Sequence, residues 1–392
     1  MLVFPAWAAW KLRPTDVLGL GWILAAALVL RLACLPGDLI FENDVFRYLW
    51  DARVSAEGIN PYRYAPAAPE LAALVDDWIF PQIPYRQVPT AYPPLAQLLF
   101  AFARSLFGES VFGLQALMIA LDCGTVWVLF RLGQKLDAPR AAAVYALHPL
   151  VLKEFAQAAH IDTAAVLLVT TAALLLTARR PRWAALALAF ATLVKIFPVF
   201  LLPAVARRLG WRNLGVYAAA VGAPFLGLLA LGVWPFGGLQ TFSSYWIFNP
   251  SLYDLVARTL GMGLPPEQAF AVARPVCGLV LLGALAVIFA RTRPAEDRSV
   301  LAGMLACTLA LLLCSPAANP WYITWLVPLG LVLGSVPAVA FTFLASLAYG
   351  FYLNGEDLPW TRLLEYGPVY GLLGLELWRR RSRAQGPARL PT

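Results

Sequence analysis

Long apolar runs separated by short polar segments are the dominant pattern of this chain. The first run covers residues 17–36, which is long enough for a helix that crosses about 30 Å of hydrocarbon. Later runs lie at 112–130, 141–152, 162–178, 213–233, 272–290, 299–314, 320–334, 336–352 and 362–378. Within a bilayer the backbone must satisfy its own hydrogen bonds, so such runs predict helices. We therefore expect an all-α polytopic membrane protein, a single domain over residues 1–392 with roughly 11–13 transmembrane or half-spanning helices.

The run 183–206 differs from the others because basic residues flank it on both sides. Lys195 and Pro198 stand near its middle, where a charge is costly in lipid and a proline interrupts a helix. These features predict two half-helices that fold back to the side from which they started.

The apolar stretch 93–107 is expected to lie in the membrane interface rather than to cross the bilayer. Counting it as a span would reverse the position of Arg131, Lys135 and Arg140 relative to the other basic clusters. The pair Pro93 and Pro94 provides a helix start. The stretch is therefore interpreted as an interfacial helix.

Composition rules out a soluble protein. Of the 392 residues, 60% are hydrophobic and 13% are charged, whereas soluble domains carry about 25% charged residues. The net charge of +8 would suggest a nucleic-acid partner in a soluble protein. Here the basic residues are gathered between apolar runs, which is the pattern of cytoplasmic loops, so we expect membrane lipids and no nucleic acid as partners.

The basic clusters predict the topology in the plasma membrane. They lie at 11–13, 131–140, 179–182, 207–212, 291–298 and 379–383, and the positive-inside rule puts all six in the cytoplasm. Both termini are then cytoplasmic, with residues 379–392 as a basic tail. Residues 37–111 form a long first extracytoplasmic loop, which holds nine acidic residues and five arginines.

The densest polar segment follows the first apolar run. If residues 41–53 are helical, Asp44, Arg47, Tyr48 and Asp51 share one face at spacings i, i+3, i+4 and i+7. Carboxylates, a guanidinium and a phenol at the membrane surface suit a polar ligand with charged parts. The alternative is a solvated amphipathic helix with ordinary ion pairs.

A second polar cluster joins two apolar runs and contains both histidines of the chain. It includes His148, Lys153, Glu154, His160 and Asp162, which are costly at a membrane boundary unless they are paired. Two histidines and two acids also permit a divalent metal, but the histidines are 12 residues apart and the ligand spacing is not compact. A metal-free site is the preferred interpretation.

Two further groups of residues have both a functional and a structural interpretation. Lys195 either contacts a ligand or extends its charge to the lipid headgroups. Asn319, Trp321 and Tyr322 either line a site or anchor a short turn at the interface. The chain contains no Walker loop, no dinucleotide-binding glycine motif and no GxSxG, so an activated substrate would arrive from the membrane.

Taken in chain order, these segments resemble the GT-C superfamily of integral-membrane glycosyltransferases, in its bacterial mannosyltransferase-like branch. The matching pieces are Glu42-Asn43-Asp44, Arg47-Tyr48-x-Trp50-Asp51, Gly58-x-Asn60-Pro61-Tyr62, Tyr92-Pro93-Pro94-Leu95, His148-Pro149-Leu150, His160-x-Asp162, Lys195-x-x-Pro198 and Asn319-Pro320-Trp321-Tyr322. The resemblance implies a GT-C fold and inverting transfer of a hexose, with mannose favoured, from a polyprenyl-phosphate donor. The acceptor would be a lipid, a glycan or a protein, and the active site extracytoplasmic.

The resemblance also implies the catalytic residue. Asp44 matches the carboxylate that acts as general base, and Asp51 is the reserve candidate. Many relatives carry two adjacent acids, whereas here Asn43 precedes Asp44, which argues against a metal-bridged pair. We expect no cofactor. The candidate substrate-binding residues are Arg47, Tyr48, Asp51, Arg53, Tyr62, Lys153, His160, Asp162, Lys195, Asn319, Trp321 and Tyr322.

Physical requirements of the reaction agree with this assignment. The attacking hydroxyl needs a base within about 3 Å, and a lipid phosphate leaving group needs cations or dipoles, for which Arg47, Lys153 and Lys195 are available. A secondary transporter, a lipid flippase and a non-catalytic assembly subunit are the alternatives. A transporter would be expected to show inverted repeats and charges at the midplane of several spans. No repeat is found and the polar residues gather on the outer side, which favours glycosyl transfer.

Overall fold

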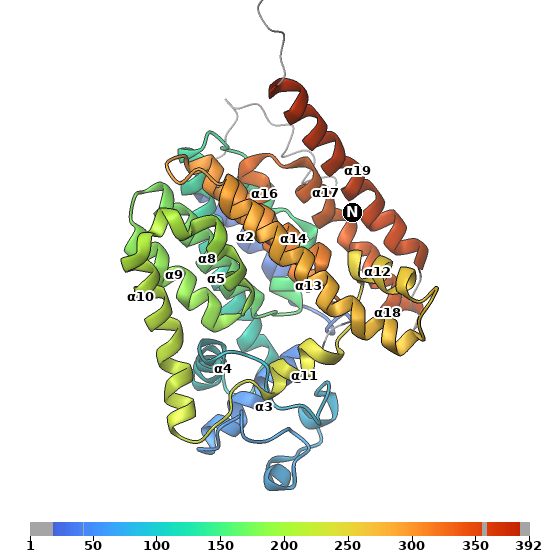
Figure 1. The fold of residues 1–392 in the computed structure, drawn as a ribbon. Helices are drawn as coiled ribbons and strands as arrows, with labels where there is room; N and C mark the ends of the chain where they lie inside the picture. Colours follow the sequence, from blue (N-terminus) through green and yellow to red (C-terminus); the bar gives the residue numbers. More distant parts are fainter. Residues whose placement is uncertain (1–18, 42, 355–358, 385–392) are drawn as a thin grey trace, which may run out of the picture.

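The computed structural model describes residues 19–41, 43–354 and 359–384, and in this part of the chain all regular structure is helical (Figure 1). Five of the described helical stretches are long and apolar enough to cross a membrane: Val111–Lys135 (α5), Phe197–Ala230 (including α10, Leu202–Ala230), Pro266–Arg291 (α13), Asp297–Cys314 (α14) and Val336–Leu353. Shorter apolar helices accompany them: Leu20–Ala33 (α2), Pro94–Phe107 (α4), Asp162–Thr177 (α8), Pro181–Val194 (α9) and Pro320–Leu333. The predicted class, an all-α polytopic membrane protein, is confirmed.

Close packing of small residues holds the central helices together. α9 packs between α8 and α10, and the buried side of α9 is largely alanine, at 184, 185, 187, 189 and 191. Small side chains let helix backbones approach closely, which supplies the van der Waals contact that replaces hydrophobic association in lipid. α8 packs in turn on α5, so these four helices form the core to which the other elements attach.

The predicted break in the run 183–206 is present. α9 ends at Val194, and Lys195 has an extended backbone with φ −148° and ψ 135°. A 3-10 helix, Phe197–Leu201, then leads into α10, whose helical geometry is interrupted at Gly210 with φ 73° and ψ 161°. Lys195 therefore lies at the turn between α9 and the helical segment that packs back against it.

The predicted continuous span 141–152 is wrong. The chain instead forms Ala141–Ala146 (α6), Pro149–Val151 (α7) and a π-helical turn, Leu152–Gln157. His148 precedes a proline and has the extended conformation (φ −71°, ψ 119°) that such a residue prefers, so the helix ends before it. The run 320–334 is also subdivided, into Pro320–Ile323 (α15), a 3-10 turn and Val327–Leu333 (α16).

Basic clusters from four parts of the chain meet at one end of the molecule. Arg208 donates to Pro294 O at 2.7 Å and pairs with Asp297, and Arg179 Nη2 lies 3.5 Å from the same Asp297 carboxylate. Arg298 donates to Leu136 O at 3.0 Å, just beyond α5. The C-terminal end of α19 (Pro359–Ala384) points to the same end, at the top of Figure 1. The cluster at 11–13 lies outside the described residues.

The segment 43–110 forms the opposite end of the molecule (Figure 1). It contains Asp44–Ala56 (α3), 3-10 helices at Pro69–Leu74 and Phe80–Gln82, and α4, which begins at Pro94 as predicted. The two ends therefore differ in character: one carries the arginine clusters and the other the acidic first loop.

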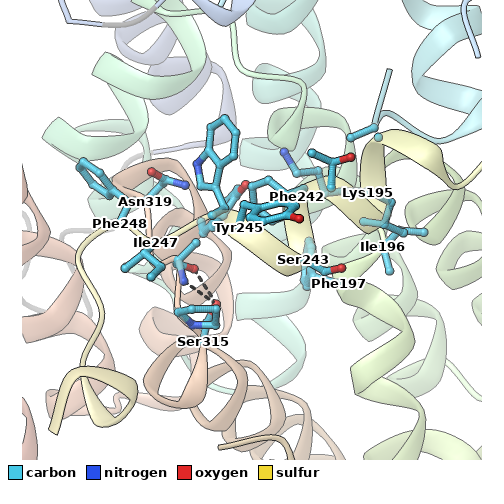
Figure 2. Close-up of a pocket in the computed structure, with 18 of the residues that line it drawn as sticks. Lys195, Ile196, Phe197, Phe242, Ser243, Tyr245, Ile247, Phe248, Ser315 and Asn319 are labelled. Atoms are coloured by element: carbon cyan, nitrogen blue, oxygen red, sulfur yellow. Dashed lines mark hydrogen bonds between the residues drawn. The ribbon is translucent and has the colours of Figure 1, made fainter. Parts of the chain in front are cut away.

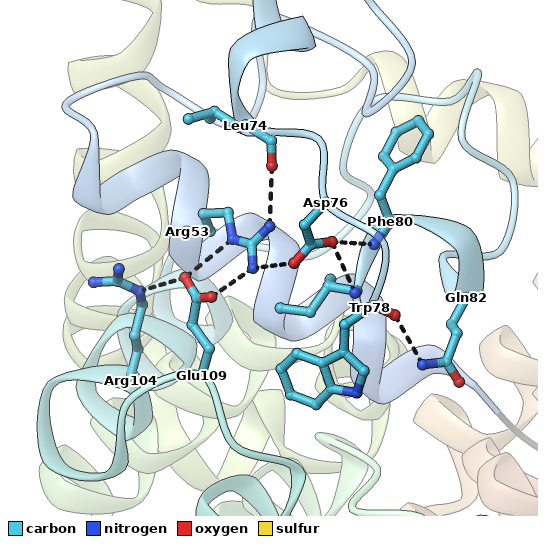
Figure 3. Close-up of polar contacts among 9 residues, drawn as sticks. Arg53, Leu74, Asp76, Trp78, Phe80, Gln82, Arg104 and Glu109 are labelled. Carbon is cyan, nitrogen blue, oxygen red and sulfur yellow. Dashed lines mark hydrogen bonds and ion pairs between the residues drawn. The ribbon is translucent and has the colours of Figure 1, made fainter.

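Arg53 is the central residue of an ion-pair cluster in this loop (Figure 3). Its guanidinium donates to Leu74 O at 3.0 Å and pairs with Asp76 at 2.7 Å and with Glu109. Burial of the Asp76 carboxyl raises its pKa, but hydrogen bonds from Arg53 and from the Phe80 and Ile79 amides outweigh this and lower the pKa to about 2. Hydrogen bonding to Arg53 likewise lowers the pKa of Glu109.

A buried ion pair joins α2 to α5. Arg31 Nε lies 2.6 Å from Asp122 Oδ2, and both side chains are fully buried. Tyr145 of α6 donates to the other carboxylate oxygen at 2.5 Å, and Arg31 also donates to Ala146 O at 3.0 Å. α2 is thus joined to α5 and α6, about 90 to 115 residues later in the chain, through one carboxylate.

Candidate functional site

A cavity of about 1400 Å³ lies between the 43–110 segment and the helix ends that face it. Gly237–Tyr245 (α11) runs beside it, and in Figure 2 the Lys195 and Asn319 segments lie on either side of the α11 residues. Its charged side chains are Asp44, Arg47, Lys195 and, from α13, Arg274, whereas apolar side chains such as Phe242, Leu281 and Leu312 come from α11, α13 and α14. The cavity therefore has a charged part and an apolar part.

Asp44 is the first residue of α3 and lines the charged part of the cavity. An acid in the first turn of a helix is favoured by the exposed amides there. Its Oδ2 accepts from the Tyr92 hydroxyl at 3.2 Å and lies 4.0 Å from His160 Nδ1, and its side chain is 25% exposed. Asn43 points its amide to Gln82 O instead, at 2.9 Å, and Glu42 lies outside the described residues. Among the described residues that line the cavity, Asp44 is the one carboxylate.

His160 connects Asp44 to a second acid, Glu154. Its Nε2 lies 3.2 Å from Glu154 Oε2, and both side chains are fully buried. Glu154 also accepts from the Tyr349 hydroxyl and lies 3.3 Å from Lys153 Nζ. The imidazole ring stacks on Trp321, with centroids 4.3 Å apart. Asp44, His160 and Glu154 thus form a row that leads from the cavity into the protein.

An unusual backbone positions this row. Glu154 belongs to the π-helical turn Leu152–Gln157, and π-helical turns occur frequently at functional sites. Ala159, directly before His160, is fully buried and has a φ of +55°, which costs of the order of 1–3 kcal/mol in a non-glycine residue. Glu154 belongs to the second polar cluster but was not predicted as a site residue, because its partner Tyr349 is 195 positions away.

Lys195 and Asp162 form an ion pair beside the cavity. Lys195 Nζ lies 3.0 Å from Asp162 Oδ2, and Trp325 Nε1 donates to Asp162 Oδ1 at 2.7 Å. The ammonium also lies over the rings of Tyr322 and Tyr92, 5.0 and 5.5 Å from their centroids. Lys195 lines the cavity and Asp162 lies behind it, so the carboxylate fixes the lysine.

The polar face predicted for α3 divides into two layers. Arg47 lines the cavity, pairs with Asp51 at 2.8 Å and donates to Val88 O at 2.9 Å, and its Nη2 has no hydrogen-bond partner in the described structure. Asp51 is buried behind it and also accepts from Gln97 at 3.0 Å. Tyr48 is buried and stacks on Phe100. Asp51 and Tyr48 therefore lie in the supporting layer rather than at the cavity surface.

The motif at 319–322 lines the cavity with all three of its predicted residues, Asn319, Trp321 and Tyr322. The Nδ2 of Asn319 and the Nε1 of Trp321 are buried and have no hydrogen-bond partner among the described residues. Phe248 N donates to Pro316 O, and Asn249 Nδ2 lies 3.1 Å from Glu365 Oε1. Glu365, which the sequence analysis missed, thus supports the neighbouring turn.

The remaining predicted residues do not line this cavity. Arg53 belongs to the loop cluster described above, and the Lys153 ammonium lies over the Tyr349 ring, 4.8 Å from its centroid. Tyr62 donates its hydroxyl to Tyr92 O at 2.7 Å. His148, which belongs to the second polar cluster but was not predicted as a site residue, contacts Thr342 Oγ1 at 3.0 Å. In the part of the chain that the structure describes, no group of three His, Cys, Asp or Glu side chains is arranged to hold a metal ion.

Comparison with known proteins gives matches over both halves of the chain. Residues 1–210 match the family model described as alpha-(1->6)-mannopyranosyltransferase, N-terminal domain, and residues 251–365 match the MptB C-terminal domain. The chain is 27% identical over 316 residues to alpha-(1->6)-mannopyranosyltransferase A of Mycobacterium tuberculosis, covering 73% of this chain and 60% of the relative. It is 25% identical over 353 residues to a probable alpha-(1->6)-mannopyranosyltransferase of Mycolicibacterium smegmatis, covering 74% and 61%. The match thus spans about three fifths of each relative's length.

Proposed function

The chain belongs to the alpha-(1->6)-mannopyranosyltransferase family, and from that premise we propose that it transfers mannose from a polyprenyl-phosphate carrier to the 6-hydroxyl of an acceptor glycan. Family membership confirms the mannosyltransferase-like resemblance found in the sequence. An α product formed by inversion requires a β-linked donor. The substrate pair is therefore a β-mannosyl polyprenyl phosphate and a mannose-containing acceptor.

The cavity is the observation that carries this proposal. Asp44, Arg47 and Lys195 line one part of it, and α11, α13 and α14 contribute apolar side chains such as Phe242, Leu281 and Leu312 together with Arg274. A polyprenyl-phosphate sugar has the same division, with a polar sugar phosphate joined to a long apolar chain. Burial of the polyprenyl chain against the apolar side chains would contribute about 25 cal/mol per Å², while the phosphate meets Arg47 and Lys195.

Asp44 acts as the general base in this scheme. As the acceptor oxygen attacks C1 of mannose, its proton passes to Asp44, and the bond between C1 and the phosphate oxygen breaks with both electrons leaving on the phosphate. Positioned bases of this kind typically contribute about 10²–10⁴-fold in rate. Asp44 is suited to the role because it lines the cavity and its side chain is one quarter exposed. The one hydrogen bond that the structure records for its carboxylate comes from a neutral donor, the Tyr92 hydroxyl.

His160 and Glu154 support the base. The imidazole lies between the two acids, with Nε2 3.2 Å from Glu154 Oε2 and Nδ1 4.0 Å from Asp44 Oδ2. Because 4.0 Å exceeds the reach of a direct hydrogen bond, Nδ1 would receive the proton that Asp44 collects through one bridging water, which resets the base. This is the arrangement in which a third group orients the proton acceptor.

Cations and polar N–H groups serve the leaving phosphate and the sugar. Arg47 and Lys195 stabilise the developing phosphate charge, because preorganised charges are most effective in a water-poor site. The unpartnered N–H groups of Asn319 and Trp321 are suited to hydroxyl groups of the sugar.

The active site is assigned to the extracytoplasmic side. The cavity lies at the acidic end of the molecule, opposite the end where Arg179, Arg208 and Arg298 meet. Basic segments remain in the cytoplasm, so the cavity would open on the far side, and both termini would be cytoplasmic.

The test is an assay with purified full-chain protein in detergent, radiolabelled mannosyl polyprenyl phosphate and an α-(1→6)-linked mannoside. Label should enter the acceptor, and Asp44→Asn should abolish nearly all of this transfer. Asp77→Asn, which changes an exposed acid of the same segment outside the cavity, is the matched control and should transfer normally. A transporter or flippase would move the labelled lipid across vesicles without forming a new glycosidic bond, and that result would overturn the proposal.

A further inference from the structure

A second hollow, of about 570 Å³, lies beside the main cavity. We name it the aromatic hollow after Tyr62, Tyr64 and Trp234, which line it together with Arg63 and Pro89. Its volume falls within the range of ordinary ligand sites, about 300–1,000 Å³. Its walls come from the first loop and from the segment 231–237 that follows α10.

Only a thin wall separates the aromatic hollow from the cavity. Pro89 lines both, while Gly237 lines the hollow and Gly238 lines the cavity. The contact is so close that a Cβ on Gly238 would lie 2.3 Å from Pro89 O and 2.5 Å from Thr90 O. No side chain fits there, so the two spaces are neighbours across a backbone contact.

Two hydrogen bonds connect the aromatic hollow to the base. The Tyr62 hydroxyl donates to Tyr92 O at 2.7 Å, and the Tyr92 hydroxyl donates to Asp44 Oδ2 at 3.2 Å. A molecule that contacts Tyr62 in the hollow is therefore separated by that one side chain from Tyr92, the residue that contacts Asp44. An acceptor that occupies both spaces must contain more than one sugar, because the backbones of Pro89 and Gly238 lie between them.

The lining of the hollow has the chemistry of a sugar-binding surface. Aromatic rings offer apolar faces with a negative quadrupole, against which the C–H face of a pyranose packs. Arg63, one nitrogen of which donates to Leu231 O at 3.3 Å, presents further N–H groups to hydroxyl oxygens. A (1→6) link has one more rotatable bond than other links between pyranoses, so an oligosaccharide can bend around Pro89.

We propose that the aromatic hollow binds the internal sugars of an α-(1→6)-linked acceptor glycan, while its terminal residue enters the cavity beside Asp44. This inference rests on the proposed function and specifies the acceptor: a chain of several mannoses is bound better than a short one. Interfacial anchoring by Trp234 and Tyr64 is the competing role, and it makes no distinction between acceptor lengths.

The experiment compares a disaccharide with a hexasaccharide of α-(1→6)-mannose, using full-chain protein and radiolabelled mannosyl polyprenyl phosphate. For Trp234→Ala and Tyr64→Ala, we expect KM for the hexasaccharide to rise about tenfold, a typical loss for one well-packed aromatic contact. Their kcat, and kcat/KM for the disaccharide, should stay at the parental values. Trp211→Ala, which alters an exposed tryptophan of α10 outside the hollow, is the control. Equal losses with both acceptors, or no loss with either, would overturn the inference.

Direct binding separates this inference from the proposed function. Titration of the hexasaccharide into protein without donor, followed by tryptophan fluorescence, should give saturable binding that Trp234→Phe largely retains and Trp234→Ala weakens. If the parental protein binds the hexasaccharide and Trp234→Ala binds it equally well, the hollow is not the glycan site, and the proposed transfer activity is unaffected. Hexasaccharide binding with no transfer from the mannosyl donor would refute the proposed function and leave the hollow as a glycan site.

Discussion

Lys195 Nζ lies 3.0 Å from Asp162 Oδ2, so the lysine at the turn after α9 is paired with the residue that begins α8. Trp325 holds the other carboxylate oxygen at 2.7 Å. Both residues were predicted from the sequence to contact the substrate. The structure places the lysine at the cavity and the acid behind it, which gives the two positions different roles.

The first prediction follows from this pair. Lys195→Ala removes a cation from the cavity and leaves the Asp162 carboxylate buried without its charge partner, which should lower the free energy of unfolding by about 3–5 kcal/mol. Adding Asp162→Asn should restore part of the stability but not the use of the donor. Thermal unfolding in detergent and KM for the donor measure the two effects separately. Normal stability and normal kinetics in Lys195→Ala would show that the ion pair contributes neither to folding stability nor to use of the donor.

The second prediction concerns Asp44 and Asp51. Asp44→Asn keeps the shape of the side chain but removes its basicity, so kcat should fall by about 10²–10⁴ with little change in KM for the donor. Asp51→Asn should cost less, because Asp51 fixes Arg47 and does not line the cavity. Steady-state kinetics of both variants provide the comparison. Parental activity in Asp44→Asn together with an inactive Asp51→Asn would transfer the base assignment to Asp51.

The third prediction tests the row of Asp44, His160 and Glu154. Glu154→Gln removes the charge that orients His160, and we expect kcat to fall about ten- to a hundredfold, equivalent to about 1.4–2.7 kcal/mol, with KM for the donor unchanged. The losses in kcat caused by His160→Ala and Glu154→Gln should be strongly non-additive. If the two residues act as a unit, either substitution removes their shared contribution and the second removes little more. Additive losses in the double variant would mean that Glu154 acts independently of His160.

The fourth prediction concerns stability at acid pH. Because the pKa of Asp76 is lowered to about 2 from a reference of 3.8, the group contributes stability that is fully present above the reference value. That contribution is lost as the pH falls from about 4 through 2. Solvent screening reduces it to about 1 kcal/mol for this partly exposed ion pair. Thermal unfolding of the parental protein and of Asp76→Asn should therefore differ at pH 6 and converge near pH 2; an unchanged difference at both pH values would exclude this linkage.

Periodicity and charge predicted the class of the protein because both are local properties of the chain. The apolar runs indicated the helices, and the position of Lys195 and Pro198 indicated the break that the structure contains. Asp44, Arg47, Lys195, Asn319, Trp321 and Tyr322 were all predicted as site residues, and all six line the cavity.

What the sequence analysis missed depends on contacts between distant segments. Glu154 becomes part of the site through Tyr349 and His160, and the first of these is 195 residues away. The helical face that carries Asp44 also carries Tyr48 and Asp51, but only the part near Asp44 and Arg47 reaches the cavity. Spacing identifies a shared face and does not reveal how much of that face another element covers.

The ion pair of Arg31 and Asp122 has a consequence for the synthesis of the protein in the cell. A guanidinium at the centre of the hydrocarbon costs about 2.5–3.5 kcal/mol on the insertion scale. Arg31 lies in the last turn of α2, so without its partner it must extend toward the lipid headgroups. Its partner carboxylate is 91 residues further along the chain, and the whole first loop is translated before α5 emerges from the ribosome. The buried pair can therefore form only after α5 has been synthesised, so the packing of α2 on α5 is completed after the first loop has been translated.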